Sequence, residues 1–331
     1  MRVAIIHNNP SQDGDLSETD VMRQVRLVGK ALDELGATHA AIPVTRALGR
    51  FLDDVYGFGP DVAFNLAESV DGRDELHPNV PAVLELIDIP CTGSPAGSLW
   101  LTTDKVIAKE IMQARDIPTP EFWTYKGPLH SHQAGQNHAK GPWIVKPAAK
   151  DASIDIDEGA VFSSLDDLVE GLPERWARLG QEPLLIERYI HGREFGVSML
   201  EGPGGVECLP PAEIVFCNYK EGTPRIVDWR AKWDPLAPSY QNTVRSFDLQ
   251  PADGLLIEEL KELAMRCWNA FRLKGYARVD LRVDEMKRPW VLEINANPCL
   301  SDDAGFMAAA MENGLMPKDI IRRILEAARP A

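Results

Sequence analysis

Two short segments near the carboxyl-terminal end of the sequence constrain the fold most, because both alternate in polarity and lie close together. They are YARVDLRVD, residues 276–284, and PWVLEIN, residues 289–295, separated by EMKR. Successive side chains of a strand point to opposite faces, so the pattern predicts an antiparallel hairpin. In the second strand we expect Trp290, Leu292 and Ile294 on one face and Val291, Glu293 and Asn295 on the other.

The polar face of this predicted hairpin combines residues that a buried strand does not carry without partners. Arg278, Asp280, Glu293 and Asn295 are expected on one side, with Arg282 further along. Burying such groups unpaired costs several kcal/mol. Two carboxylates and an amide oxygen suit Mg²⁺, whose remaining ligands are usually phosphate oxygens. The alternative is a solvent-facing strand with a salt bridge from Arg278 to Glu293 or Asp280.

Composition narrows the classes of function. The 331 residues suffice for two or three domains, and the formal net charge is −15. An acidic chain is a poor partner for nucleic acid or an anionic membrane, although local clusters of Lys and Arg can still bind small anions. Five widely spaced cysteines without a CxxC motif indicate free thiols. We therefore expect a cytoplasmic protein without nucleic-acid or membrane partners.

The first hundred residues alternate between apolar runs and amphipathic segments. RVAII reads as a buried strand, residues 21–35 as a helix ending at Gly36, DVAFNLA as a strand and VPAVLELIDI as a helix. This order predicts an α/β unit with a mainly parallel sheet. Further along, WIVKP and PLLIERYI read as strands, with EFGVSML as the neighbour of the latter. Residues 212–245 read as strands and loops, and the tail as two helices.

Several charged residues stand at the ends of these elements. Lys146 ends an apolar strand before a polar loop, and Lys105 begins a helix, where backbone N–H groups favour anions. Glu187 ends an apolar strand just before His191-Gly192, and Glu194 lies where it can reach ribose hydroxyls. Taken singly, each of these residues is more often a solvated end.

Together and in this order, these segments resemble the ATP-grasp superfamily, and within it the D-alanine–D-alanine ligase family. The resemblance covers nearly the whole chain. It rests on FNLAE, ELIDIPCTGS, DKVIAKEIMQARDIPTP, PWIVKP, LLIERYIHGREF, AKW and YARVDLRVDEMKRPWVLEINANP. It implies an α/β fold, α+β in the ATP-grasp part, with three domains: 1–102, 103–185 and 186–331, the last carrying the metal and catalytic residues.

The resemblance also implies roles, residue by residue. Asp280, Glu293 and Asn295 match metal ligands, and Lys105, Lys146 and Lys232 match phosphate-binding lysines. Glu187, Tyr189 and Ile190 match the adenine-binding hinge, Glu194 the ribose contact, and Arg278 the arginine that stabilises the oxyanion. Asp20 falls near the carboxylate that receives the first substrate's ammonium group, and Ser153 remains in the loop after PWIVKP. The implied cofactors are ATP and two Mg²⁺ ions, or Mn²⁺ in their place.

The implied reaction is the ATP-dependent joining of a small carboxylate to an amine through an acyl phosphate, with release of ADP and phosphate, in a homodimer. The part that would bind the second substrate departs from the family. Asp155 replaces a glycine, Trp233 a tyrosine, and Ala304 stands where a serine binds a carboxylate. We therefore expect a product other than D-alanyl-D-alanine. Asp302 and Asp303 suggest a substrate with a neutral or cationic group opposite them.

Two other functions remain open. The chain is alternatively a non-catalytic ATP-binding module, or another ATP-grasp phosphotransferase or carboxylase. The presence of every matched metal ligand and of Arg278 argues against the first, and the absence of a motif for a carrier group argues against the second.

Overall fold

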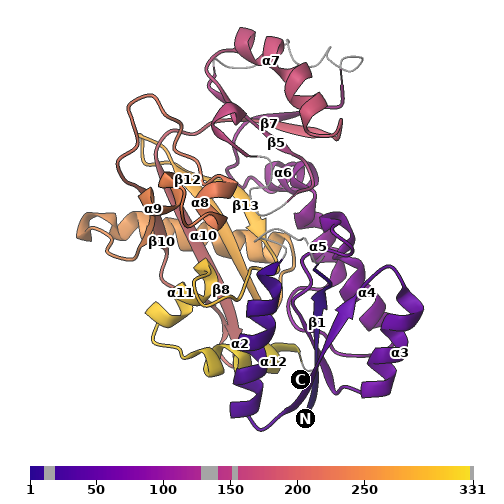
Figure 1. The fold of residues 1–331 in the computed structure, drawn as a ribbon. Helices are drawn as coiled ribbons and strands as arrows, with labels where there is room; N and C mark the ends of the chain where they lie inside the picture. Colours follow the sequence, from indigo (N-terminus) through magenta and orange to yellow (C-terminus); the bar gives the residue numbers. More distant parts are fainter. Residues whose placement is uncertain (11–18, 128–140, 151–155, 329–331) are drawn as a thin grey trace.

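The computed structural model describes residues 1–10, 19–127, 141–150 and 156–328, arranged around three sheets (Figure 1). Ser153 and Asp155, two residues singled out in the sequence, lie outside the described residues. Among the described helices, none has the length and apolar run needed to cross a bilayer.

The first sheet is parallel, as the sequence predicts, with the order β2-β1-β3. Its strands are β1 (Arg2–Asn8), β2 (Thr38–Val44) and β3 (Val62–Asn65), and its helices are α2 (Val21–Glu34), α3 (Leu48–Phe58) and α4 (Asn79–Leu86). Helix α2 buries its apolar stripe, including Val28 and Leu32, against this sheet. The chain leaves α2 through Gly36 at φ +68°, a conformation that glycine adopts without strain.

The second sheet is antiparallel and has the order β4-β7-β5-β6. It is reached through α5 (Ala96–Thr103) and α6 (Lys105–Ala114), with the short 3₁₀ turn Asp74–Leu76 earlier in the chain. Its elements are β4 (Phe122–Tyr125), β5 (Trp143–Pro147), the 3₁₀ turn Glu158–Ala160, β6 (Val161–Phe162), α7 (Leu165–Arg178) and β7 (Leu184–Arg188). Helix α7 starts where the Ser164 side chain accepts a hydrogen bond from the Asp167 backbone N–H.

The third sheet is the largest, with the order β11-β10-β8-β12-β13 and β9 paired to β8. The strands are β8 (Arg193–Gly202), β9 (Gly205–Cys208), β10 (Ala212–Phe216), β11 (Thr243–Ser246), β12 (Tyr276–Val283) and β13 (Pro289–Asn295). Helix α10 (Gly254–Ala270), which follows the 3₁₀ turn Pro251–Asp253, covers its apolar face. The polar residues of β12 and β13 line a cavity together with residues of the second sheet.

Two sequence-based expectations are wrong here. The strand EFGVSML is not the neighbour of PLLIERYI: β7 pairs with β4 and β5, whereas β8 pairs with β9, β10 and β12. The chain changes sheets at Gly192, whose φ is +141° and where an added Cβ would lie 1.9 Å from the Val283 carbonyl oxygen. Residues 212–245 also contain helices α8 (Trp229–Trp233) and α9 (Pro238–Asn242), which are too short to show a periodic pattern.

The two predicted carboxyl-terminal helices are present as α11 (Gly305–Glu312) and α12 (Pro317–Ala328). Helix α12 packs against both α2 and β8, and it also contacts β3 of the first sheet. Ile321 and Ile324 share one apolar cluster with Val28 and Leu32 of α2. The first sheet and the tail are therefore held together by a common core. The division into domains 1–102, 103–185 and 186–331 stays a proposal; its second boundary falls within β7, a strand of the second sheet.

Candidate active site

A cavity of about 1480 Å³ lies where the three sheets face one another. Its lining includes residues from α2, from β5 and β7 of the second sheet, from α8, and from the β12–β13 hairpin. Most of the residues that the sequence singles out meet at this cavity, among them Asp20, Lys146, Glu187, Tyr189, Ile190, Glu194, Lys232, Arg278, Asp280, Glu293 and Asn295.

The predicted hairpin is present, but one part of the predicted pattern is wrong. Strands β12 and β13 are antiparallel, with Asp280 opposite Glu293 and Arg278 opposite Asn295. The register shifts after Asp280, because Leu292 is an extra residue in β13. This bulge breaks the alternation: Val291 and Ile294 both belong to the apolar core, whereas Leu292 lines the cavity next to Glu293.

Arg278, Asp280 and Asn295 form one hydrogen-bonded group on this hairpin. The Arg278 guanidinium donates to both oxygens of Asp280, at 2.7 and 2.9 Å, and the Asn295 amide donates to Asp280 Oδ2 at 3.1 Å. Burial disfavours the charge of Arg278, but Asp280 more than offsets this and raises the pKa of the arginine. The salt bridge considered from the sequence therefore exists, on a strand that lines a cavity.

Glu293 is the carboxylate on which the cations converge. The Lys105 Nζ lies 3.4 Å from Glu293 Oε1 and also donates to the Lys150 carbonyl at 2.6 Å. Burial raises the pKa of Glu293, but Lys105, Lys232, Lys146 and Arg278 together lower it to about 2. Glu293 is thus a carboxylate at neutral pH. Lys232 also lines this cavity. Desolvation by the surrounding protein lowers its pKa.

The start of α6 does not act as the sequence suggests. The Asp104 side chain accepts hydrogen bonds from the Val106 and Ile107 backbone N–H groups, at 2.9 and 3.1 Å. A carboxylate already caps this helix end, so the side chain of Lys105, rather than the helix terminus, is what the element offers to an anion.

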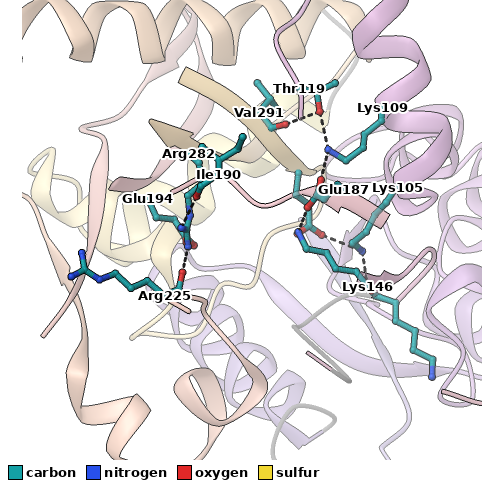
Figure 2. Close-up of polar contacts among 12 residues, drawn as sticks. Lys105, Lys109, Thr119, Lys146, Glu187, Ile190, Glu194, Arg225, Arg282 and Val291 are labelled. Atoms are coloured by element: carbon teal, nitrogen blue, oxygen red, sulfur yellow. Dashed lines mark hydrogen bonds and ion pairs between the residues drawn. The ribbon is translucent and has the colours of Figure 1, made fainter. Parts of the chain in front are cut away.

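Glu187 lines the cavity and lies between two lysines (Figure 2). Lys109 Nζ is 2.7 Å from Glu187 Oε2, and Lys146 forms an ion pair with Glu187 Oε1. Both Glu187 and Lys109 are 1% exposed. Burial raises the pKa of Glu187, but the two lysines lower it to about 2. Lys109 also donates to Thr119 Oγ1 at 2.8 Å, and Thr119 donates to the Val291 carbonyl at 2.9 Å.

Residues 189–194, which follow β7, are anchored by Arg282, whose side chain is 4% exposed. Its guanidinium donates to Glu194 Oε2 at 3.0 and 2.6 Å, to the Ile190 carbonyl at 3.1 Å, and to the Arg225 carbonyl (Figure 2). The Tyr189 hydroxyl donates to the same Arg225 carbonyl at 3.1 Å. Three of the four residues expected at the base and ribose of a nucleotide, Tyr189, Ile190 and Glu194, therefore accept hydrogen bonds from one buried arginine.

Asp20 meets the segment that follows the hairpin. It is 5% exposed, and its Oδ2 accepts hydrogen bonds from Ser301 Oγ at 2.6 Å and from Cys299 Sγ at 3.2 Å. Asp302 and Asp303 do not stand as unpaired acids: both are exposed and lie 3.4 and 3.5 Å from the Arg23 guanidinium. Their pairing weakens the expectation of a cationic group opposite them.

A second arginine stands close to Arg278. A Cβ added at Gly305 would lie 3.5 Å from Arg278 Nη1 and 3.8 Å from Arg245 Nη2. Arg245 donates to the Asp303 backbone carbonyl at 3.0 Å and forms no ion pair with any described residue. Burial lowers its pKa, and Arg278 lowers it further. Two guanidinium groups thus share this end of the cavity, and only Arg278 has a carboxylate partner among the described residues.

Lys109 and Arg245 were not identified from the sequence. The role of Arg282 in anchoring Ile190 and Glu194 was not identified either. Lys109 had a signal, because it follows Lys105 by one helical turn and so lies on the same face of α6. Arg282 also had one, because it continues the alternation of Arg278 and Asp280 along β12. Arg245 had none, because it reaches Gly305 from a distant part of the chain.

The oxygen-bearing side chains of the β12–β13 hairpin are of the type that binds a hard divalent cation. Asp280 and Glu293 face each other across the hairpin with Asn295 alongside, and oxygen atoms of this kind suit Mg²⁺. No cluster of three His, Cys, Asp or Glu side chains suited to a metal occurs among the residues that the structure describes. Further ligands would therefore have to come from water or phosphate oxygens.

Comparisons with known proteins relate this chain to D-alanine–D-alanine ligases. The family model described as D-ala D-ala ligase C-terminus matches residues 111–326. The D-alanine–D-alanine ligase of Thermotoga sp. strain RQ2 is 27% identical over 328 residues, covering 99% of this chain and 97% of that protein. The uncharacterized protein y4sG of Sinorhizobium fredii is 33% identical over 269 residues, covering 81% of this chain and 74% of that protein.

The fold has the same relatives. The crystal structure of the D-alanine–D-alanine ligase from Bacillus anthracis complexed with ATP matches with a TM-score of 0.74 and 21% identity, covering 99% of this chain and 97% of that one. These comparisons define an ATP-dependent ligase that forms carbon–nitrogen bonds. The chain belongs to the D-alanine–D-alanine ligase family of the ATP-grasp superfamily.

Proposed function

We propose that this protein joins a small carboxylic acid to an amine by way of an acyl phosphate, using ATP and Mg²⁺. The observation that carries this proposal is that Lys146, Lys232, Arg278 and Glu293 line one cavity, with the Lys105 Nζ 3.4 Å from Glu293 Oε1. Phosphoryl transfer requires positioning and neutralisation of charge more than covalent chemistry by the protein. A cavity with several cations around a carboxylate pair supplies both.

The proposed roles come from the family resemblance, and the positions of most of these residues around one cavity support them. Glu187, Tyr189 and Ile190 hold the adenine, Glu194 holds the ribose, and Lys105, Lys146 and Lys232 hold the phosphates. Asp280, Glu293 and Asn295 would hold Mg²⁺, which draws charge from the phosphate oxygens. Asp20 receives an ammonium group of the first substrate. Ser153 lies outside the described residues, and its catalytic role stays a prediction from the resemblance.

The reaction then proceeds in two displacements. An oxygen of the substrate carboxylate attacks the γ-phosphorus, and the bond from this phosphorus to the β,γ-bridging oxygen breaks to release ADP. The amine attacks the carbonyl carbon of the acyl phosphate, loses a proton, and expels phosphate. Arg278 is placed to stabilise the negative oxygen that forms at this carbon.

Arg245 bears on the second substrate. Because it shares the end of the cavity with Arg278 and has no ion-pair partner among the described residues, it favours an amine that carries a carboxylate. An amino acid meets this requirement. D-Alanine is the first candidate because the relatives are named D-alanine–D-alanine ligases. Trp233 and Ala304, which both line the cavity, are the departures that would exclude it.

The test is ADP release by the purified protein with Mg²⁺ and ATP, across carboxylic acids and amines singly and in pairs, with mass detection of products. Hydroxylamine is added in parallel, because it converts an acyl phosphate into a hydroxamate. An amide product together with a hydroxamate supports the proposal. A phosphorylated product without amide favours a phosphotransferase, and tight ATP binding without turnover favours a binding module. A homodimer and a cytoplasmic location remain proposals, to be tested by sedimentation and by fractionation.

A further inference from the structure

A buried lysine that the proposed chemistry does not use lies directly behind the nucleotide site. Lys109 is 1% exposed and is not among the residues that line the described cavity. Its ammonium group contacts Glu187 and Thr119, and Thr119 continues the chain of contacts to the Val291 carbonyl of β13 (Figure 2). A charged lysine at such depth requires a specific partner, because desolvation of an unpaired ammonium group is costly.

The charges of this group do not balance. Glu187 carries one negative charge, and each of its oxygens faces a different lysine, Lys109 or Lys146. Lys109 is enclosed, whereas Lys146 is 15% exposed and lines the cavity. The three side chains therefore carry one excess positive charge, and the exposed member of the group presents it to the cavity.

We propose that Lys109 is a positioning residue that neutralises Glu187 from behind, so that the positive charge of Lys146 remains available to the phosphates of the nucleotide. Without Lys109, Lys146 and Glu187 form a neutral pair, and a phosphate has to compete with Glu187 for the lysine. The inference rests on the proposed nucleotide site and adds a residue that does not touch the nucleotide.

The experiment separates the phosphate part of binding from the rest. The dissociation constants of ADP with Mg²⁺ and of adenosine are measured by calorimetry for the wild type and for Lys109→Met, which keeps the length of the side chain without its charge. Lys109→Met is expected to weaken ADP binding by about tenfold and to leave adenosine binding nearly unchanged. A general loss of structure would weaken both ligands, so the ratio of the two constants is the readout.

Two further variants serve as controls. Lys109→Met combined with Glu187→Gln removes both enclosed charges and should restore the wild-type ratio. Thr119→Val breaks the link to β13 but keeps all three charges, so its ratio should also match the wild type. The inference is overturned if Lys109→Met leaves the ratio unchanged, if the double variant is as impaired as the single one, or if Thr119→Val reproduces the loss.

Glu187→Gln alone keeps the test decisive if Lys109→Met does not fold, as judged by circular dichroism. The preference of this variant for ADP over adenosine should equal or exceed that of the wild type. A lower preference contradicts the inference. Failure of the wild type to bind either ligand would instead refute the nucleotide site itself, and with it the proposed function.

Discussion

Replacing Arg282 by methionine tests how the proposed base- and ribose-binding residues are held. The guanidinium is 4% exposed and serves Glu194, the Ile190 carbonyl and the Arg225 carbonyl. The loss of the hydrogen bonds to these three groups, at about 1 kcal/mol for each group, costs about 3 kcal/mol. Breaking a buried ion pair costs about 3–5 kcal/mol, and Glu194, at 14% exposed, still reaches water. We therefore expect the free energy of unfolding to fall by about 3 kcal/mol.

Urea denaturation followed by tryptophan fluorescence measures this loss, with Arg282→Lys as the matched control. Lysine keeps the charge but lacks the planar fork that reaches a carboxylate and two carbonyls together, so we expect it to recover part of the loss and no more. Adenosine and ADP should bind more weakly to Arg282→Met by the same factor, because the base and ribose contacts loosen while the phosphate contacts do not. A wild-type unfolding midpoint in Arg282→Met, or full recovery by Arg282→Lys, would refute the reasoning.

Three further predictions follow from other residues of the cavity. Arg245→Gln should raise KM for the amine substrate about tenfold while KM for ATP stays constant, and steady-state kinetics with each substrate varied in turn will show whether it does. Asp280→Asn and Glu293→Gln should each lower the rate of ADP release about a hundredfold or more at saturating Mg²⁺, and a rate within a few-fold of the wild type would remove these residues from the metal site. Glu187 has its pKa lowered from 4.5 to about 2, so its contribution to stability is complete above pH 4.5 and is lost as the pH falls toward 2. The urea midpoint should therefore fall over this range in the wild type and less steeply in Glu187→Gln.

Sequence alone predicted the parts of the site that depend on local patterns. The β12–β13 hairpin, the parallel first sheet and the strands carrying Lys146 and Glu187 are all present, because strand and helix periodicities are set by neighbours in the chain. The roles proposed for these residues stay predictions until they are measured.

The bulge at Leu292 and the pairing of β8 could not be read from the same patterns. An extra residue in one strand does not change the alternation of polar and apolar residues in the sequence. It is identified only from the pairing with the partner strand, which fixes the register. Likewise, PLLIERYI and EFGVSML are adjacent in sequence, and the tight approach of Gly192 to β12 is what sends them into different sheets. The contact of Arg245 with the Gly305 region depends on tertiary packing in the same way.

The whole chain has a net negative charge, whereas lysines and arginines line the cavity. A net charge of −15 disfavours non-specific binding to polyanions. Lysines and arginines nevertheless surround Glu187 and Glu293. Cations this close repel one another, so without a ligand they need an anion among them. The two carboxylates meet this need, and their low pKa values keep them ionised. A nucleotide that brings several negative charges can then replace part of this pairing without rearranging the fold. The two carboxylates therefore allow a cationic site to exist before its anionic ligand arrives.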